Sequence, residues 1–87
     1  MYRVTFTSTA ESDLSRLDKP IAIRVLKKLR WLADNLEIIT PERLSGELKS
    51  AFKLRVGDYR ILYTFDRKKH QIIVHFIRHR REIYKTK

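Results

Sequence analysis

The fold is decided by one alternating stretch, Phe52-Lys53-Leu54-Arg55-Val56-Gly57-Asp58-Tyr59-Arg60-Ile61-Leu62-Tyr63. On both sides of Gly57-Asp58 apolar side chains recur at every second position, and this period of two predicts two strands, each with one buried face. Gly-Asp is a pair typical of the two-residue loop that closes a tight hairpin. With that loop, Val56 pairs with Tyr59, and Arg55 lies directly opposite Arg60.

The two faces of this predicted hairpin differ in chemistry. The face expected to meet the core carries Phe52, Leu54, Val56, Tyr59, Ile61, Tyr63 and Phe65. The opposite face carries Lys53, Arg55 and Arg60. Like charges directly opposite each other destabilise a sheet, whereas converging cations suit a bound phosphate. The residues alone are consistent with two interpretations of this basic face, an anion-binding site and a face that is only solvated.

Upstream of the hairpin, the sequence predicts a strand and two helices. An alternating segment at residues 2–6 indicates a short strand with one buried face. Ser8-Thr9-Ala10-Glu11 is a capping box that should open a helix, and Asp18-Lys19-Pro20 should end it and start the next. The apolar residues of the second helix recur every three or four positions: Ala22, Val25, Leu26, Leu29, Leu32, Ala33 and Leu36. Residues 38–50 are predicted to form a loop or a single turn.

Downstream of the hairpin, a charged turn over residues 66–70 leads into a last strand. Residues 72–77 are apolar on both faces, which favours an interior strand. The order β-α-α-β-β-β predicts an α+β fold, in which a helical hairpin packs on one face of a mostly antiparallel sheet. Eighty-seven residues leave room for one such domain, spanning 1–87.

The charge of the chain narrows the class of partner. The sequence has 20 Lys and Arg against 10 Asp and Glu, a net charge of +10, and residues 45–87 hold +8 of it. Such a charge predicts a polyanionic partner, with nucleic acid as the first candidate. There is no cysteine and no apolar run long enough for a membrane span or a signal peptide, so we expect a cytoplasmic protein without disulfides.

No familiar catalytic or metal motif is present in the sequence. The spacing of His70, His75 and His79 is weak evidence for a metal site, and His75 is expected to be structural. The chain has no phosphate-binding glycine motif and no Ser-His-Asp pattern. We therefore expect neither a metal nor a cofactor.

A second basic group follows the last predicted strand. Arg78-His79-Arg80-Arg81 precedes an apolar and aromatic pair, Ile83 and Tyr84. A frayed basic tail is the simplest interpretation. The pair near the end instead favours docking onto the body of the protein or stacking on a base.

The two basic groups together resemble the RelE/ParE superfamily of type II toxins. The resemblance rests on residues 49–63, on Leu44-Ser45-Gly46 before them and on residues 77–84 after them. It implies a toxin that a cognate antitoxin neutralises by wrapping its surface, and a basic toxin calls for an acidic, partly helical antitoxin. It also implies one of two activities: the RelE branch cleaves mRNA in the ribosomal A site, and the ParE branch poisons DNA gyrase.

The resemblance assigns roles that favour the RelE branch. Lys53 and Arg60 stand where RelE-type toxins have a catalytic lysine and a catalytic arginine. Arg80 is similar to their second catalytic arginine, and the choice between Arg80 and Arg81 stays open. Tyr84 is similar to the tyrosine that stacks on an mRNA base.

Two positions depart from the family pattern. Ala51 stands where RelE-type motifs often have a further lysine, so part of the usual charge is missing. His79 is a titratable group that the RelE pattern does not require, although some related toxins use a histidine there.

Cleavage of RNA by its own 2′-OH needs a base, an acid and stabilisation of a negatively charged transition state. Arginine does not deprotonate, so Arg60 and Arg80 are assigned to the transition-state charge, with Arg55 in support. Lys53 is a candidate base where surrounding cations favour its neutral form, and His79 is the alternative.

Further contacts to RNA and to the ribosomal small subunit are expected from Lys49, Arg55, His79, Arg81, Lys27 and Lys28. The competing interpretations are a ParE-like gyrase poison without nuclease activity and a plain nucleic-acid-binding module.

Overall fold

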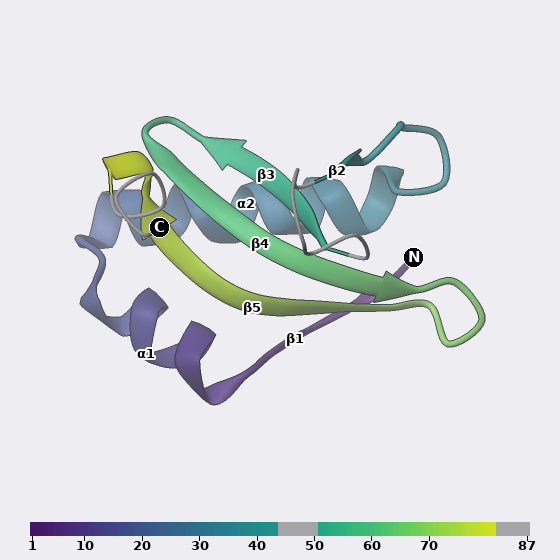
Figure 1. Ribbon diagram of the computed structural model, residues 1–87, viewed down its shortest axis with the longest axis horizontal. Coiled ribbons are helices and arrows are strands. Elements are labelled where there is room, and N and C mark those ends of the chain that lie inside the picture. The colour runs from purple at the N-terminus through teal and green to yellow at the C-terminus, as the bar shows by residue number, and fades with distance from the viewer. Residues whose placement is uncertain (44–50, 82–87) are drawn as a thin grey trace.

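Five strands form one mixed sheet in the computed structural model, which describes residues 1–43 and 51–81 (Figure 1). In chain order the elements are β1 (Arg3–Phe6), α1 (Ser8–Arg16), α2 (Lys19–Asn35), β2 (Glu42–Arg43), β3 (Phe52–Val56), β4 (Tyr59–Asp66) and β5 (Gln71–His79). The strands lie in the order β1-β5-β4-β3-β2. Only β1 and β5 are parallel neighbours within these ranges. The predicted α+β fold with a mostly antiparallel sheet is confirmed.

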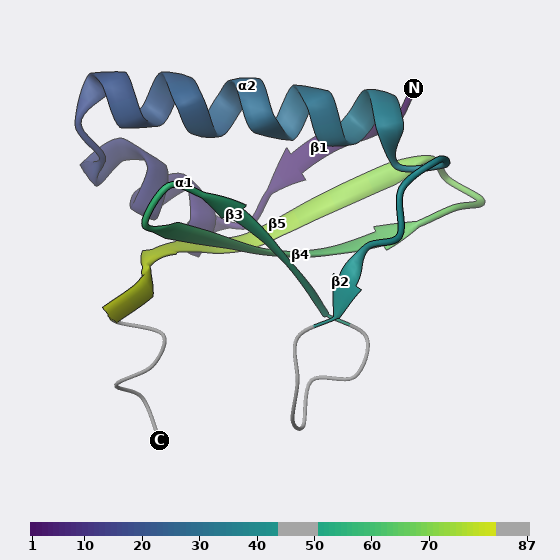
Figure 2. The ribbon, with the colours of Figure 1, turned by 90° about the horizontal axis from the view of Figure 1, so that it is seen from above.

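Both helices lie on the same side of the sheet, and the opposite face carries neither of them (Figure 2). The core between the layers joins Val25, Leu29, Leu32, Ala33 and Leu36 to the sheet residues Val56, Ile61, Tyr63, Ile72, Val74 and Ile77. Leu26 belongs to the recurring apolar positions of this helix but is 45% exposed. An α-helix turns 100° per residue, which places Leu26 on the flank of the buried stripe. Within the described ranges, neither helix is long and apolar enough to cross a membrane.

The first helix begins one residue before the predicted capping box. Thr7 is the N-cap, and its hydroxyl oxygen accepts a hydrogen bond from the Ala10 N–H at 3.1 Å. The same hydroxyl donates to the His75 carbonyl at 3.0 Å. The predicted box from Ser8 to Glu11 is therefore wrong in register, because Thr7 satisfies a helix N–H and a strand carbonyl at once. The second helix starts as predicted, with Asp18 as N-cap and Pro20 in the first turn.

A short edge strand lies inside the predicted loop 38–50. In β2, Glu42 pairs with Lys53 and Arg43 pairs with Phe52. A strand of two residues is too short to leave a period in the sequence, which explains why a loop was expected there. Residues 44–50 lie outside the described part of the chain.

The hairpin of β3 and β4 has the predicted register. Arg55 pairs with Arg60, and Val56 pairs with Tyr59. Gly57 has a φ of +57° and Asp58 does not enter the left-handed region, the pattern of a type II′ turn that needs glycine first. The turn residues therefore fix which side chains share a face.

The last strand, β5, lies between β1 and β4, as its apolar sequence predicted. Its pairing with β4 shifts by one residue between Leu62 and Tyr63, so that His75 has no register partner in β4. This β-bulge turns His75 and Phe76 to the face away from the helices. The His75 ring there lies 2.9 Å from the Thr64 hydroxyl, measured from Nε2 to Oγ1.

Candidate nucleic-acid interface

Three arginines lie side by side on the sheet face opposite the helices. Arg55 of β3 pairs with Arg60 of β4, and Arg60 pairs with Arg78 of β5. The Cβ atoms of directly opposed residues are about 5 Å apart. We call Arg55, Arg60 and Arg78 the arginine row. It concentrates three positive charges in one line across three strands, on the sheet face away from the helices.

Arg78 joins this row although the sequence pattern gave it no site role. The bulge at His75 returns Ile77 to the core, where it pairs with Ile61, and thereby turns Arg78 to the outer face. An uninterrupted period of two from Ile72 would have turned Arg78 toward the helices. The one sequence signal for the outward position of Arg78 was the apolar Ile77 just before it. An inward-facing Ile77 breaks the alternation that starts at Ile72.

Arg60 is buried even though it lies on the outer face. It is 7% exposed, and its Nη1 atom has no hydrogen-bond partner in the described part of the chain. A buried charge without a partner is strongly unfavourable. A phosphate or another oxyanion would supply the missing acceptor, because guanidinium groups match such oxygens geometrically.

Lys53 lies on the same face as the arginine row, one row further along the strands. Its register partners are Glu42 on one side and Leu62 on the other, and Leu62 in turn pairs with Phe76. The Lys53 Nζ forms an ion pair with the Glu42 Oε2 at 3.4 Å. An anion that approaches Lys53 therefore competes with a carboxylate.

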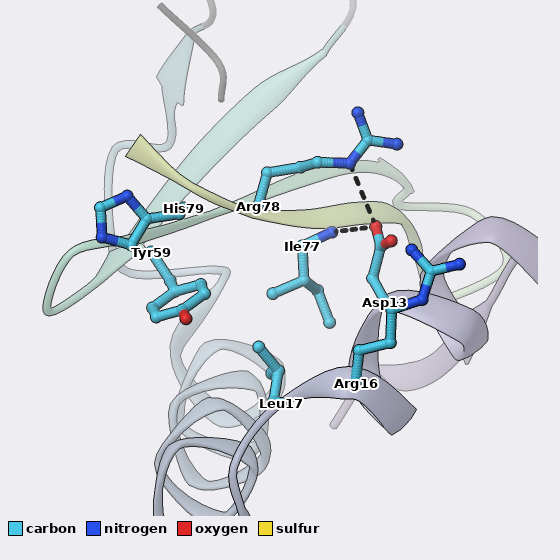
Figure 3. A pocket seen from close by; sticks show the side chains of 7 residues that line it. All are labelled: Asp13, Arg16, Leu17, Tyr59, Ile77, Arg78 and His79. Atoms are coloured by element: carbon cyan, nitrogen blue, oxygen red, sulfur yellow. Dashed lines mark hydrogen bonds and ion pairs between the residues drawn. The ribbon is translucent and has the colours of Figure 1, made fainter. Parts of the chain in front are cut away.

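Arg78 is held by two neighbours (Figure 3). Its Nε lies 3.4 Å from the Asp13 Oδ2, and its guanidinium carbon lies 4.7 Å from the centre of the Phe76 ring. Asp13 comes from α1 on the helix side, and Phe76 comes from the outer face of β5. The side chain therefore sits at the edge of β5, where the two sides of the sheet meet.

His79 lies on the other side of the sheet from the arginine row. It pairs with Tyr59, which packs against the core, and the two rings meet edge to face at 5.3 Å. Both line a pocket of about 450 Å³ beside the end of α1, together with Asp13, Arg16, Leu17, Ile77 and Arg78 (Figure 3). The structure thus brings Lys53, Arg55 and Arg60 together but does not bring His79 to them.

The predicted residues Arg80 and Arg81 follow β5 in a helical turn. The Arg80 N–H donates to the Asp58 carbonyl at 2.7 Å, which ties this turn to the loop between β3 and β4. The Arg81 N–H donates to the His79 Nδ1 at 3.2 Å. Both arginine side chains are exposed at the end of the sheet that carries the arginine row.

The remaining predicted contacts fall elsewhere or outside the described residues. Lys27 and Lys28 belong to α2 in the helix layer, and the Lys28 Nζ lies 4.1 Å above the Trp31 ring. Lys49 and Tyr84 lie outside the described residues. Within residues 1–43 and 51–81, no group of three His, Asp or Glu side chains is arranged to hold a metal ion.

The chain is a small α+β protein with a helix layer on one face of a five-stranded sheet. The other face carries the arginine row and is suited to bind anions. The chain belongs to the family described as "ParE toxin of type II toxin-antitoxin system, parDE", whose model matches residues 4–84. This family lies in the RelE/ParE superfamily, so the chain is a toxin of a type II toxin-antitoxin system.

Individual relatives agree with this assignment. The chain is 31% identical to Toxin RelG of Mycobacterium tuberculosis over 84 residues, which cover 97% of each protein. It matches a chain of the toxin-antitoxin complex RelBE2 from Mycobacterium tuberculosis with a TM-score of 0.79 and 30% identity, over 90% of each chain. The isolated RelE toxin of E. coli shares the fold, with a TM-score of 0.76 and 21% identity over 98% of this chain and 93% of that one.

Proposed function

We propose that this type II toxin is a ribosome-dependent mRNA endonuclease, which inhibits translation by cleaving mRNA in the ribosomal A site. The observation that carries the proposal is the buried Arg60 guanidinium, which lies between Arg55 and Arg78 and has an unpaired Nη1. A phosphodiester whose charge increases in the transition state fits such a site better than a neutral ligand does. The relatives named RelG and RelE support the same branch of the superfamily.

The chemistry follows from the groups that the arginine row provides. The 2′-oxygen attacks the adjacent phosphorus and the bond to the 5′-oxygen breaks, which leaves a cyclic phosphate and a 5′-OH. The proton lost by the 2′-OH must leave the site, and the 5′-oxygen must gain one. Arg60, Arg55 and Arg78 would neutralise the pentacovalent phosphate. Lys53 lies on their face whereas His79 does not, which favours Lys53 as the group that accepts the 2′-OH proton. Only its neutral amine can do so, so Lys53 would first separate from Glu42 and release a proton to water. The proton that Lys53 then gains from the 2′-OH balances the one that the 5′-oxygen takes up from water.

The roles expected for Arg80, Arg81, Lys49 and Tyr84 remain part of the proposal. Arg80 and Arg81 stand beside the loop between β3 and β4. Arg80 would add its charge to the stabilisation of the transition state, and Arg81 would bind the RNA backbone next to the cleaved bond. Tyr84 would stack on a base, and Lys49 would bind a further phosphate. Lys27 and Lys28, in the helix layer, would instead contact ribosomal RNA.

Dependence on the ribosome follows from the poor proton-transfer groups on this face. Lys53 is already paired with Glu42, and His75 is already bonded to Thr64. Catalysis would therefore rest on positioning of the mRNA and on charge stabilisation. A ribosome that holds the mRNA in line for attack supplies that positioning.

We also propose that an acidic antitoxin covers the arginine row. Solved relatives include toxins bound to their antitoxins, such as RelBE2 of Mycobacterium tuberculosis and RelBE of E. coli. Carboxylates of the antitoxin would supply the oxygens that the Arg60 guanidinium lacks. Inhibition would then be competition for the same charges that bind RNA.

The test is cleavage of a translated mRNA, mapped at its 5′ ends. Purified toxin should cut mRNA on programmed ribosomes, cut naked RNA much more slowly, and leave RNA with a 2′-deoxy residue at the cut site intact. Arg60→Ala should abolish the cut, and Arg30→Ala, which removes an exposed arginine from the helix layer, should not. New 5′ ends that persist with Arg60→Ala, or no cleavage by the wild type, would overturn the proposal.

A gyrase poison is the second candidate, because the matching family model carries the ParE description. A supercoiling assay with purified gyrase separates the two functions. Inhibition of supercoiling at toxin concentrations that leave mRNA intact would favour this alternative.

A further inference from the structure

The carboxylate of Asp13 takes the place of a missing strand beside β5. Pairing between β1 and β5 ends at Phe6 and Val74, so the next part of that β5 edge has no partner strand among residues 1–43 and 51–81. Asp13 in α1 is 8% exposed, and its Oδ2 accepts the Ile77 N–H at 2.9 Å. A strand N–H that would otherwise stay unpaired is thus satisfied by a side chain from the helix layer.

The same oxygen also holds the Arg78 side chain. Asp13 Oδ2 lies 3.4 Å from the Arg78 Nε, and the guanidinium lies over the Phe76 ring. In Figure 3 the Nε faces the carboxylate while the two terminal nitrogens point away from it. An arginine engaged through Nε keeps its terminal nitrogens available for a second oxyanion.

We propose that Asp13 is a positioning residue of this toxin, which orients the Arg78 guanidinium so that its terminal nitrogens meet the scissile phosphate. The proposal rests on the proposed nuclease function for its catalytic part, but the contact itself can be tested without that function. It makes α1 a part of the site, although no residue of α1 lies on the face of the arginine row.

The position of the negative charge gives this role a distinctive signature. Asp13 orients a cation, which favours the transition state, but it also lowers the positive potential that attracts RNA. Removal of the charge should therefore lower kcat and also lower KM. If Asp13 were needed only for folding, its substitution would reduce the fraction of active protein. That would lower the apparent kcat and leave KM unchanged, as in any other variant of the same stability.

The experiment compares Asp13→Asn with Glu11→Gln in the purified toxin. An asparagine oxygen can still accept the Ile77 N–H, but it cannot pair with a guanidinium as a carboxylate does. Glu11→Gln removes the same charge from an exposed site on the same helix. On programmed ribosomes we expect Asp13→Asn to lower kcat between about 10- and 100-fold, as misplacement of a reacting group by about 1 Å does. We expect Glu11→Gln to match the wild type.

A second readout follows the Arg78 Nε–H resonance by NMR, assigned by its loss in Arg78→Lys. In the wild type and in Glu11→Gln, this resonance should have a distinct chemical shift and exchange slowly with solvent. In Asp13→Asn its chemical shift should move to that of a freely rotating, exposed arginine. Phe76→Leu should shift it to a smaller extent.

An Nε–H signal that Asp13→Asn leaves unchanged would overturn the inference, whatever the activity. So would an unchanged kcat in Asp13→Asn once that signal has collapsed. A wild type that forms the contact but never cleaves mRNA would instead reject the nuclease function and, with it, the catalytic part of this role.

Discussion

Arg60 and Arg78 are register partners across β4 and β5, yet their charges are satisfied very differently. Arg78 has a carboxylate from α1 at 3.4 Å, whereas the buried Nη1 of Arg60 has no acceptor among the described residues. The sheet therefore places Arg78, which a carboxylate orients, beside Arg60, whose Nη1 has no acceptor. The unsatisfied one lowers the stability of the free protein, and a bound oxyanion would recover that stability.

The first prediction concerns the free energy of unfolding. Arg60→Met should raise it by about 1–3 kcal/mol, because a buried unpaired polar group is replaced by an apolar side chain of similar length. The same variant should lose mRNA cleavage. Urea denaturation gives the first quantity, with the exposed Arg55→Met as the control that should change little. A less stable Arg60→Met would show that Arg60 makes a favourable contact.

The second prediction concerns inorganic phosphate as a probe of the arginine row. An anion that binds only the folded state should raise the melting temperature, and at 100 times its dissociation constant it adds about 2.7 kcal/mol. Chloride at matched ionic strength should not do so. Thermal unfolding of the wild type, Arg60→Met and Arg30→Ala would locate the effect, and an equal response in Arg60→Met would place the anion elsewhere.

The third prediction concerns the ion pair between Lys53 and Glu42. Glu42→Gln frees the Lys53 ammonium for RNA, so the KM for programmed ribosomes should fall about two- to fivefold, the scale of an exposed ion pair. The free energy of unfolding should change by less than about 1 kcal/mol. Kinetics with Glu11→Gln as control tests this, since that change removes a charge from the helix layer. A KM that rises in Glu42→Gln would mean that Glu42 itself helps to bind substrate.

The fourth prediction concerns stability in alkaline solution. Burial raises the pKa of Tyr63 from its ordinary value of 10.0 to about 12. The unfolded chain therefore loses this proton at a lower pH than the folded protein, and the stabilisation present below pH 10 declines as the pH rises toward 12. Tyr63→Phe should lack this decline, so its stability relative to the wild type should increase by about 2 kcal/mol across that range. Urea denaturation at pH 9, 10 and 11 measures the difference, and parallel curves for the two proteins would contradict it.

The fold was predictable where short-range rules determine it. The loop Gly57-Asp58 sets every pair between β3 and β4, so the position of Arg55 opposite Arg60 followed from counting. The start of α2 followed from Asp18 and Pro20 in the same way. Thr7 became the cap of α1 because it also reaches the carbonyl of His75, and no local pattern contains that distant contact.

The site was predictable only in part, because one of its members depends on long-range register. Lys53, Arg55 and Arg60 share a hairpin, and the alternation brings them together. Arg78 depends on how β5 pairs with β4, and its partner Asp13 depends on where β1 ends. His79 looked equally close to the site in sequence, but its pairing with Tyr59 puts it on the other side of the sheet.

The bulge at His75 separates the length of β5 from the face on which Arg78 lies. If all nine residues of β5 paired with β4 without a bulge, the alternation from Ile72 would carry Arg78 to the helix side. Deletion of His75 would instead remove only the residue that has no partner in β4, and Phe76, Ile77 and Arg78 would keep their present pairs. The three arginines would then still share a face in a strand that is one residue shorter. A search for relatives with the same arginine row should therefore align this strand with a one-residue gap allowed at the bulge, because a fixed spacing from Ile72 would miss them.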